Sequence, residues 1–214
     1  MRLLSFFIIL FVSVSASAFA ADSSPKAYIL KESDKVIIAK IENYLSGVNT
    51  ISSEFIQAAP SGDISTGKFY LKRPGKLRME YAPPVPVLMI TSGSNIVYYD
   101  KELDQVSRIS LEDTLVGFLA RSQVKFDDGV IITGLENQNN IIRVTLIQSK
   151  TPKDGSLTLE FADNPMILHN MIVSDKSGQI TTVSLNNARF NGEINEELFV
   201  FKDPHLGAKR SIKN

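Results

Sequence analysis

The sequence predicts a mainly β protein of the α+β class, with an antiparallel sheet of about eleven strands that curls toward a barrel or half-barrel. From residue 50 onward, short runs of alternating apolar and polar residues follow one another, each bounded by Gly, Pro, Asn or Asp. The turns between them are too short for the crossovers that parallel pairing needs. So many strands do not stay in one flat, open sheet.

One amphipathic helix opens the predicted domain, over residues 34–45. Ser33 is the expected N-cap, and Gly47 lies beyond the expected end. The helical period places four apolar side chains on one face: Ile37, Ile41, Tyr44 and Leu45. We expect this face to cover the concave side of the sheet.

The first half of the sheet follows this helix. Its expected strands are residues 50–58, 65–73, 76–81, 87–91, 95–100 and 105–109. A second helix is predicted over residues 111–120, because Ser110 and Asp113 have the spacing of a capping box. Leu115, Phe118 and Leu119 form its apolar stripe.

The second half of the sheet resumes after this helix. Its expected strands are residues 130–135, 141–148, 157–161, 168–173 and 179–190, and a last run at 198–201 is expected to pair at an edge. A curled sheet covered by two short helices makes a pocket for an apolar ligand.

The N-terminus has the pattern of a secretory signal peptide: Arg2, an apolar run, and small residues up to Ala20. We expect cleavage after about Ala20 and a single mature domain over residues 21–214, with a flexible leader at 21–32 and a frayed tail at 205–214. The chain has no Cys, so its core must suffice without disulfides. A bacterial periplasm fits this combination best.

The charge balance gives no sign of a nucleic-acid partner. Without Arg2, 22 basic residues face 23 acidic ones, a net charge of −1. The outward residues Lys68, Lys72, Lys76 and Arg78 could mark a docking surface or a solvated sheet face, and we favour the solvated face.

Enzyme, metal and cofactor motifs are weak in this chain. The Walker-like run that starts at Gly62 and ends at Lys68 has Phe69 where Ser or Thr should hold Mg²⁺, and it leads into a strand, so it is a hairpin turn. His169 and His205 lack a neighbouring His or carboxylate at ligand spacing. No nucleophile elbow occurs. We therefore expect no catalysis, no metal and no cofactor.

Arg73 is the anomaly in the pattern. In a period-two strand it shares a face with Phe69 and Leu71, so a guanidinium points with the apolar set. Burying that charge without partners is costly, so Arg73 either pairs or faces a cavity that opens and closes.

The neighbouring apolar residues fill either an ordinary core or a cavity wall. The inward Arg73, the interior Met79 and Met89, and a sheet large enough to enclose a ligand favour a cavity. The expected lining residues are Phe55, Phe69, Leu71, Leu77, Met79, Tyr81, Leu88, Ile90, Ile96 and Tyr98.

A family pattern covers the same residues. The run Gly67-x-Phe69-x-Leu71-x-Arg73-Pro74-Gly75-x-Leu77-Arg78-x-Glu80-Tyr81 resembles the signature of the LolA family, the periplasmic carriers of outer-membrane lipoproteins. Flanking matches are Ser53-Glu-Phe55-Ile-Gln57, Pro84, Ser92-Gly93, Tyr98-Tyr-Asp100, Gln105-Val106 and Phe199-x-Phe201-x-x-Pro204.

The resemblance implies an unclosed antiparallel β-barrel with a helical lid over an apolar cavity. It also implies a carrier, expected to be a monomer, that takes lipoproteins by their acyl chains from an inner-membrane ABC-type release complex and passes them to an outer-membrane receptor. In the family, the Arg of the Arg-Pro pair, here Arg73, bonds lid carbonyls in the closed, empty form.

The chain also departs from the family pattern. Several relatives carry Trp where this chain has Met79 and Val97, and this chain has no Trp. The main alternative is a carrier or sensor of another periplasmic lipid. A lipid-acting hydrolase and a structural envelope scaffold are the alternatives from other classes.

Overall fold

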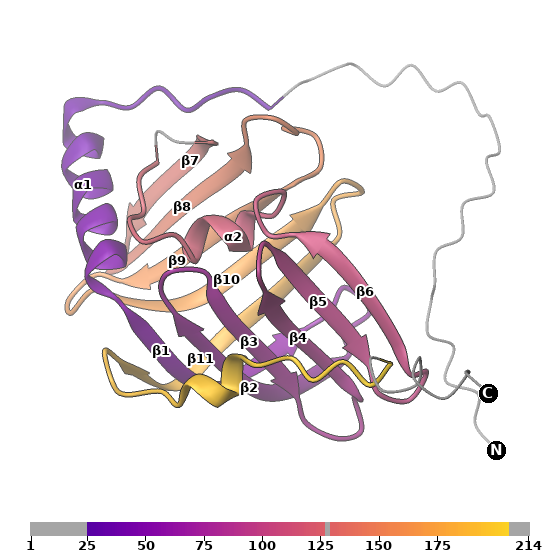
Figure 1. The fold of residues 1–214 in the computed structure, drawn as a ribbon. Coiled ribbons are helices and arrows are strands. Elements are labelled where there is room, and N and C mark those ends of the chain that lie inside the picture. The colour runs from indigo at the N-terminus through magenta and orange to yellow at the C-terminus, as the bar shows by residue number, and fades with distance from the viewer. Residues whose placement is uncertain (1–24, 127–128, 206–214) are drawn as a thin grey trace, which may run out of the picture.

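The computed structural model describes residues 25–126 and 129–205. Its centre is an eleven-stranded antiparallel sheet in the order β6-β5-β4-β3-β2-β1-β11-β10-β9-β8-β7. The sheet curves strongly, but its end strands β6 and β7 are not neighbours, so the barrel is not closed (Figure 1). This is the predicted fold class.

The strands of the first half are β1 (Thr50–Ala58), β2 (Ile64–Lys72), β3 (Lys76–Tyr81), β4 (Val87–Ser92), β5 (Asn95–Asp100) and β6 (Gln105–Ser110). Those of the second half are β7 (Val130–Gln138), β8 (Ile141–Gln148), β9 (Gly155–Ala162), β10 (Ile167–Asp175) and β11 (Ile180–Phe190). Each half is a meander, and β1 pairs with β11 to join the two. The predicted signal peptide lies outside the described residues, as does most of the predicted frayed tail.

Two helices lie inside the curve of the sheet (Figure 1). Helix α1 (Glu32–Gly47) is longer at both ends than predicted. Ser33 is not its N-cap, because the helix has already begun there. Instead the Asp34 carboxylate accepts a 2.9 Å hydrogen bond from the backbone N–H of Lys31, the residue before the helix.

Helix α2 (Leu115–Leu119) is much shorter than the predicted span of residues 111–120. Its N-cap is Thr114, whose hydroxyl accepts a 3.0 Å hydrogen bond from the N–H of Gly117. A Cβ on Gly117 would lie 1.9 Å from the carbonyl oxygen of Leu111, so glycine is required at this tight approach. The residues of the predicted capping box lie before the helix: Ser110 ends β6 and Asp113 lies in the turn that follows.

The segment before α1 is attached to the sheet, although its sequence predicts a flexible leader. The N–H of Tyr28 donates a 2.8 Å hydrogen bond to the carbonyl of Ile132 on β7. Tyr28 and Leu30 also pack against the main core. This part of the leader thus lies against β7, at one end of the sheet.

The C-terminal segment crosses the outer face of the sheet. The run predicted as an edge strand at residues 198–201 is instead a short 3-10 helix, η1 (Glu196–Phe199), followed by extended chain. Asn195 caps it by accepting a 3.0 Å hydrogen bond from the N–H of Glu197. η1 lies against β3 and β4, on the face away from the helices (Figure 1).

Most buried apolar side chains form one core between the concave face of the sheet and the two helices. A second cluster, Leu88, Ile90 and Val97, lies on the outer face, where Tyr99, Val106 and Phe201 pack against it. The sheet is therefore covered on both faces at β4 and β5.

Candidate functional site

An apolar cavity of about 90 Å³ lies between the helices and the concave face of the sheet. Both helices and both halves of the sheet contribute to its wall. The polar members of the lining are Arg73 and Tyr44. A cavity of this composition favours apolar ligands and offers no nucleophile for chemistry.

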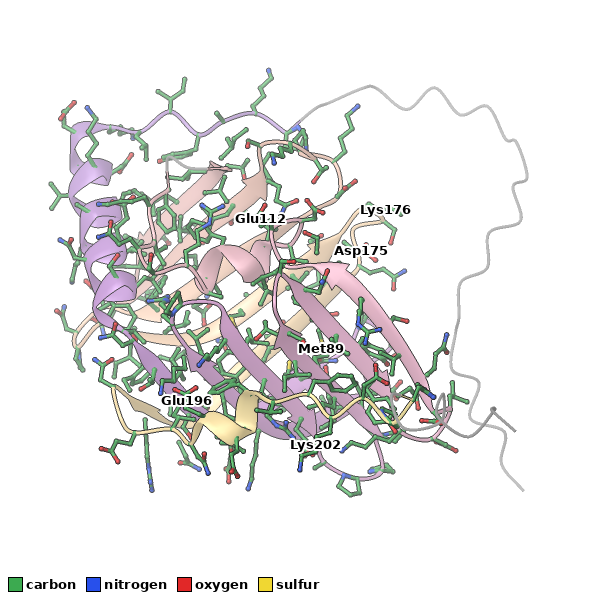
Figure 2. All side chains as sticks on the ribbon, in the orientation of Figure 1. Met89, Glu112, Asp175, Lys176, Glu196 and Lys202 are labelled. Atoms are coloured by element: carbon green, nitrogen blue, oxygen red, sulfur yellow. The ribbon has the colours of Figure 1, made fainter. Side chains whose placement is uncertain are left out.

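Five of the predicted lining residues line this cavity: Phe69, Leu71, Leu77, Met79 and Ile96. Cross-strand pairing explains why they meet. Phe69 pairs with Met79, and Leu71 with Leu77, so strict alternation keeps these four side chains on the concave face. Met79 pairs in turn with Met89, which also lines the cavity and is labelled in Figure 2.

Phe55, Tyr81 and Tyr98 lie near the cavity without forming its wall. Phe55 is buried, and its ring meets that of Tyr81 edge-on at 5.1 Å. The Tyr81 hydroxyl donates a 2.7 Å hydrogen bond to Gln57, and burial raises the pKa of Tyr81 to about 12. Tyr98 pairs with Met89 and so shares its face, and burial raises the Tyr98 pKa as well.

The prediction for Leu88 and Ile90 is wrong. Both alternate with Met89 on β4, so they point to the outer face and join the second cluster. Both faces of β4 are buried, so apolar side chains occur at successive positions of this strand. The sequence therefore lacks the apolar–polar alternation that would show which side chains face the cavity.

Nine further residues of the cavity wall are not among those that the sequence predicts. They come from α1, the chain just after it, β1, α2 and the second half of the sheet: Tyr44, Val48, Ile51, Val116, Leu157, Leu168, Met171, Val173 and Val183. The alternation of Leu157, Leu159 and Phe161 was a usable signal for the inward face of β9. The residues of the second half of the sheet lie near those of the first half because β1 pairs with β11, and no local sequence pattern reveals this long-range pairing.

The predicted lid residues all belong to the main core. Ile41, Leu45, Phe118 and Leu119 are buried, whereas Ile37 and Leu115 are half-buried and pack against them. Leu45 and Leu119 line the cavity directly. The apolar faces of α1 and α2 therefore close the cavity on the side opposite the sheet.

Arg73 follows β2 directly and joins the two helices. Its Nε donates a 2.8 Å hydrogen bond to the carbonyl of Leu119, in the last turn of α2. Its Nη1 donates to the carbonyls of Leu45 and Val48 at the end of α1, the latter at 2.6 Å. These acceptors are the backbone groups that a helix end leaves without partners.

Burial lowers the pKa of Arg73 to about 10, and the nearby Tyr44 opposes this shift. The guanidinium therefore remains charged at neutral pH. Its charge has backbone carbonyls as partners, not a carboxylate, so the hydrogen bonds are charge-assisted but can be exchanged for water when the helices move.

The outward basic residues bind the C-terminal segment. Lys72 and Lys76 both pair with Glu196 of η1, labelled in Figure 2, and these contacts lower the pKa of Glu196 to about 2. Arg78 donates a 3.0 Å hydrogen bond to the carbonyl of Leu198. The sequence pattern favours a solvated sheet face for the four basic side chains, whereas three of them, Lys72, Lys76 and Arg78, bind this segment.

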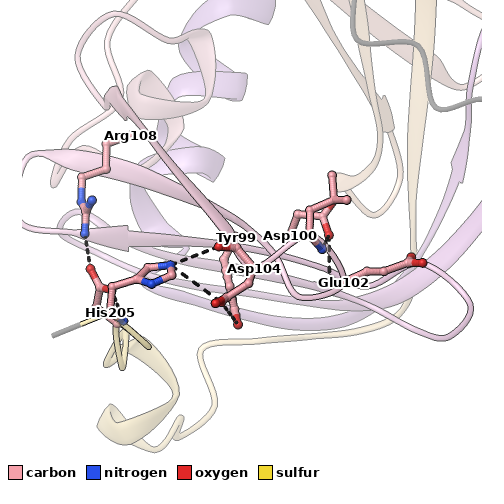
Figure 3. A network of polar contacts seen from close by, with 8 residues as sticks. Tyr99, Asp100, Glu102, Asp104, Arg108 and His205 are labelled. Atoms are coloured by element: carbon pink, nitrogen blue, oxygen red, sulfur yellow. Dashed lines mark hydrogen bonds and ion pairs between the residues drawn. The ribbon is translucent and has the colours of Figure 1, made fainter. Parts of the chain in front are cut away.

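A second set of polar contacts fixes the end of the same segment (Figure 3). Arg108 on β6 forms a 2.7 Å ion pair with Asp203. The His205 ring lies 3.1 Å from the carbonyl of Asp104, and the Tyr99 hydroxyl donates a 3.2 Å hydrogen bond to the Asp104 carboxylate. These contacts tie residues 203–205 to β5 and β6.

Within residues 25–126 and 129–205, no group of three or more His, Asp or Glu side chains could hold a metal ion. In the same part of the chain, no helix is long and apolar enough to cross a membrane.

Comparison with known proteins gives relatives along most of the chain. It is 27% identical over 184 residues to an uncharacterized protein of Rickettsia prowazekii, which covers 86% of this chain and 84% of that protein. It is 26% identical over 174 residues to the outer-membrane lipoprotein carrier protein of Methylococcus capsulatus, covering 78% and 83%. Among solved structures, a LolA superfamily protein from Nitrosomonas europaea is 12% identical, with a TM-score of 0.44 and coverage of 77% and 95%.

The family match extends across both halves of the sheet. Residues 46–202 match the family described as outer membrane lipoprotein carrier protein LolA. This span includes Arg73, all eleven strands of the sheet and the C-terminal segment as far as residue 202. The chain belongs to the LolA family.

Proposed function

We propose that this protein is a periplasmic carrier of lipoproteins. Its cavity takes the acyl chains of lipoproteins released from the inner membrane by an ABC-type complex, and the loaded carrier delivers them to an outer-membrane receptor. It acts as a monomeric binding protein, without catalysis or a cofactor. Membership of the LolA family and the names of relatives such as the Methylococcus capsulatus protein support this proposal.

The apolar cavity closed by Arg73 is the observation that carries the proposal. At about 90 Å³ the cavity is smaller than the ~150 Å³ cavity that accepts benzene in another protein, so it has no room for an acyl chain as it stands. Ligand entry therefore requires the helices and the sheet to separate. The hydrogen bonds of Arg73 oppose that separation because they join both helices to the end of β2.

Two opposing free energies, burial of acyl chains and re-formation of the Arg73 hydrogen bonds, would allow both uptake and release of a ligand. Burial of acyl chains contributes about 0.8 kcal/mol for each methylene removed from water. Re-forming the Arg73 bonds on release returns part of that free energy, each charge-assisted bond being worth about 1.5–3 kcal/mol. The closed form thus favours hand-over of the ligand to a receptor, whereas the apolar wall favours uptake.

The direct test is release of lipoproteins from membranes. Mature protein is added to inner-membrane vesicles that contain the release complex, ATP and a radiolabelled lipoprotein, and the soluble label is measured. We expect the wild-type protein to hold the label in solution, and Met89→Gln, which places an amide in the cavity wall, to hold much less. Ile109→Gln on β6 is the matched control, since Ile109 is 52% exposed and lies outside the wall.

Delivery is tested separately with Arg73→Leu. We expect this variant to accept lipoprotein from the vesicles but to transfer it poorly to outer-membrane vesicles. The reason is that closure no longer forms the hydrogen bonds from Arg73 to the carbonyls of Leu119 and Val48. Normal transfer would remove Arg73 from the mechanism. If mass spectrometry finds another periplasmic lipid co-purifying in place of lipoproteins, the cargo assignment is wrong although the binding site is not.

A further inference from the structure

The open sheet has two end strands, and their edges differ. At β7 the chain before α1 contacts the edge: the N–H of Tyr28 donates a 2.8 Å hydrogen bond to the carbonyl of Ile132. The β7–β8 ladder also has a register shift between Ile132 and Gly134. At β6, no segment among residues 25–126 and 129–205 pairs with the side of the strand that faces away from β5 (Figure 1). We call this side the β6 edge.

The register shows which main-chain groups lie along the β6 edge. The N–H of Leu111, just after β6, donates a 2.8 Å hydrogen bond to the carbonyl of Ser94, just before β5. Because hydrogen-bonded and non-hydrogen-bonded pairs alternate in an antiparallel ladder, every second residue of β6 bonds β5, Ile109 among them. The N–H and C=O groups of Val106 and Arg108 therefore point away from the sheet. Within the described chain these main-chain groups have no hydrogen-bond partner.

The β6 strand lacks the features by which edge strands commonly avoid pairing. Its sequence, Gln-Val-Ser-Arg-Ile-Ser, contains no Pro and no Lys, and its ladder with β5 contains no bulge. Four of its six residues are exposed. A regular, exposed edge of this kind is a template to which an extended peptide can add through main-chain hydrogen bonds.

The C-terminal segment holds the β6 edge in shape. Val106 packs on the second apolar cluster, as does Phe201. Arg108, labelled in Figure 3, forms its 2.7 Å ion pair with Asp203. These side chains belong to the same two residues whose main-chain groups face the edge. The edge is therefore already fixed as a strand, and less conformational entropy is lost when a peptide adds to it.

The β6 edge also lies close to the apolar cavity. Ile96 on β5 lines the cavity, and its partner on β6 is Ile109. Neighbouring strands lie about 4.8 Å apart, so a strand added to β6 would run about 10 Å from the backbone of β5. An extended chain covers about 10 Å in three residues. A polypeptide whose first residue carries acyl chains in the cavity thus reaches the β6 edge within its first few residues.

We propose that the β6 edge binds the polypeptide that follows the acylated residue of the ligand, as an added strand held by main-chain hydrogen bonds. The inference rests on the proposed lipoprotein-carrier function. Main-chain groups are the same in every sequence apart from Pro, so this mode of binding accepts acylated polypeptides that share no sequence.

A second copy of this chain is the competing occupant of the β6 edge. Two β6 strands paired antiparallel about Arg108 would place two arginines opposite each other, and like charges at such positions destabilise a strand pair. The polypeptide of a bound ligand avoids this repulsion. Its acyl chains also hold it beside the edge, which raises its effective concentration there.

Backbone methylation of a synthetic ligand tests the proposal on the unmodified protein. The probe is a triacylated cysteine followed by six serine and threonine residues, the length of β6. Two further probes carry the same number of backbone N-methyl groups, one at the even positions and one at the odd positions of the peptide. Only one of these two sets of N–H groups can face β6, because alternate residues of a strand bond to opposite sides. The acyl chains fix the register, since a slip of one residue would move the cysteine by about 3.4 Å.

Binding is measured by displacement of an apolar fluorescent probe from the cavity. We expect the unmethylated lipopeptide to bind about tenfold more tightly than triacylated cysteine amide, which has no polypeptide. One methylation pattern should remove this gain and the other should leave it nearly unchanged. Equal effects of the two patterns, or no gain from the peptide, would overturn the inference and leave the carrier function standing if the cysteine amide still binds. If the cysteine amide does not bind, the carrier function fails and the inference fails with it.

A matched pair of variants tests the protein side. Arg108→Pro removes a main-chain N–H from the β6 edge, whereas Arg108→Ala keeps that N–H and removes only the ion pair with Asp203. With both variants shown to be folded by urea unfolding, we expect Arg108→Pro to lose the gain from the peptide and to bind triacylated cysteine amide as Arg108→Ala does. Equal gains in the two variants would contradict the proposal. A wild-type dimer that Arg108→Pro converts to a monomer in sedimentation would show that the edge binds a second copy, and the assignment of the ligand polypeptide would be wrong.

Discussion

The affinity of the carrier for a soluble lipopeptide should rise when Arg73 is replaced by Leu. In the closed form the guanidinium bonds the carbonyl of Leu119 on α2 and those of Leu45 and Val48 at the end of α1. Entry of a ligand must break at least the bond to α2. The leucine side chain cannot make any of these bonds, so opening loses less free energy in the variant.

The size of the effect follows from the number of bonds that open. One hydrogen bond from a charged donor contributes about 1.5–3 kcal/mol. If only the Arg73–Leu119 bond breaks, Kd should fall by a factor of about 10 to 150, and if the α1 bonds break as well the factor should be larger. A measured factor within this range would agree with rupture of the Leu119 bond alone.

The assay is displacement of an apolar fluorescent probe by a triacylated lipopeptide at neutral pH. Arg78→Leu is the control, because Arg78 bonds Glu80 and the carbonyl of Leu198 on the outer face, away from the cavity. Urea unfolding must show that both variants are folded at the assay temperature. An unchanged or higher Kd for folded Arg73→Leu would refute the reasoning that these bonds oppose opening.

Three further predictions concern stability. Gly67→Ala should destabilise the protein by about 1–3 kcal/mol in urea unfolding, because a Cβ there would lie 2.2 Å from the carbonyl oxygen of Glu80, whereas Gly47→Ala, with open space around its Cβ, should change little. Tyr81→Phe should reduce the loss of thermal stability between pH 10 and 12: the raised pKa of this buried phenol gives stability that is present below pH 10 and is lost as pH rises to about 12. Glu42→Gln should lower the free energy of unfolding in urea by about 1–2 kcal/mol, because the Glu42 carboxylate accepts hydrogen bonds from a backbone N–H at 2.7 Å and from a lysine at 3.1 Å. An unchanged free energy of unfolding would contradict this role.

The strands were the most predictable part of the fold. The predicted limits 50–58, 76–81, 95–100 and 141–148 coincide with β1, β3, β5 and β8, because turn residues bound each run. Helix α2 was less predictable. Its true cap is Thr114, and the close approach of Gly117 to the Leu111 carbonyl depends on the turns before the helix, which the capping-box spacing at Ser110 and Asp113 does not indicate.

Part of the site, the position of Arg73, could also be predicted from the strand pattern. Arg73 was recognisable because a charge on an apolar face of a strand contradicts its neighbours, and the structure places it between the two helices. The orientation of Leu88 and Ile90 was not recognisable, because it depends on a C-terminal segment more than 100 residues later that covers the outer face. Long-range burial of this kind removes the polar half of the strand pattern on which such predictions depend.

The second apolar cluster also makes the two halves of the sheet mechanically unequal. At β4 and β5, side chains are packed on both faces, and the ion pairs of Glu196 and Asp203 fasten the covering segment at two points. On β9 and in the middle of β8 the outward side chains are instead hydrophilic, among them Arg143, Thr158 and Glu160, although Ile147 near the end of β8 is buried. We therefore expect the half of the sheet that contains β8 and β9 to deform more readily than the half that contains β4 and β5.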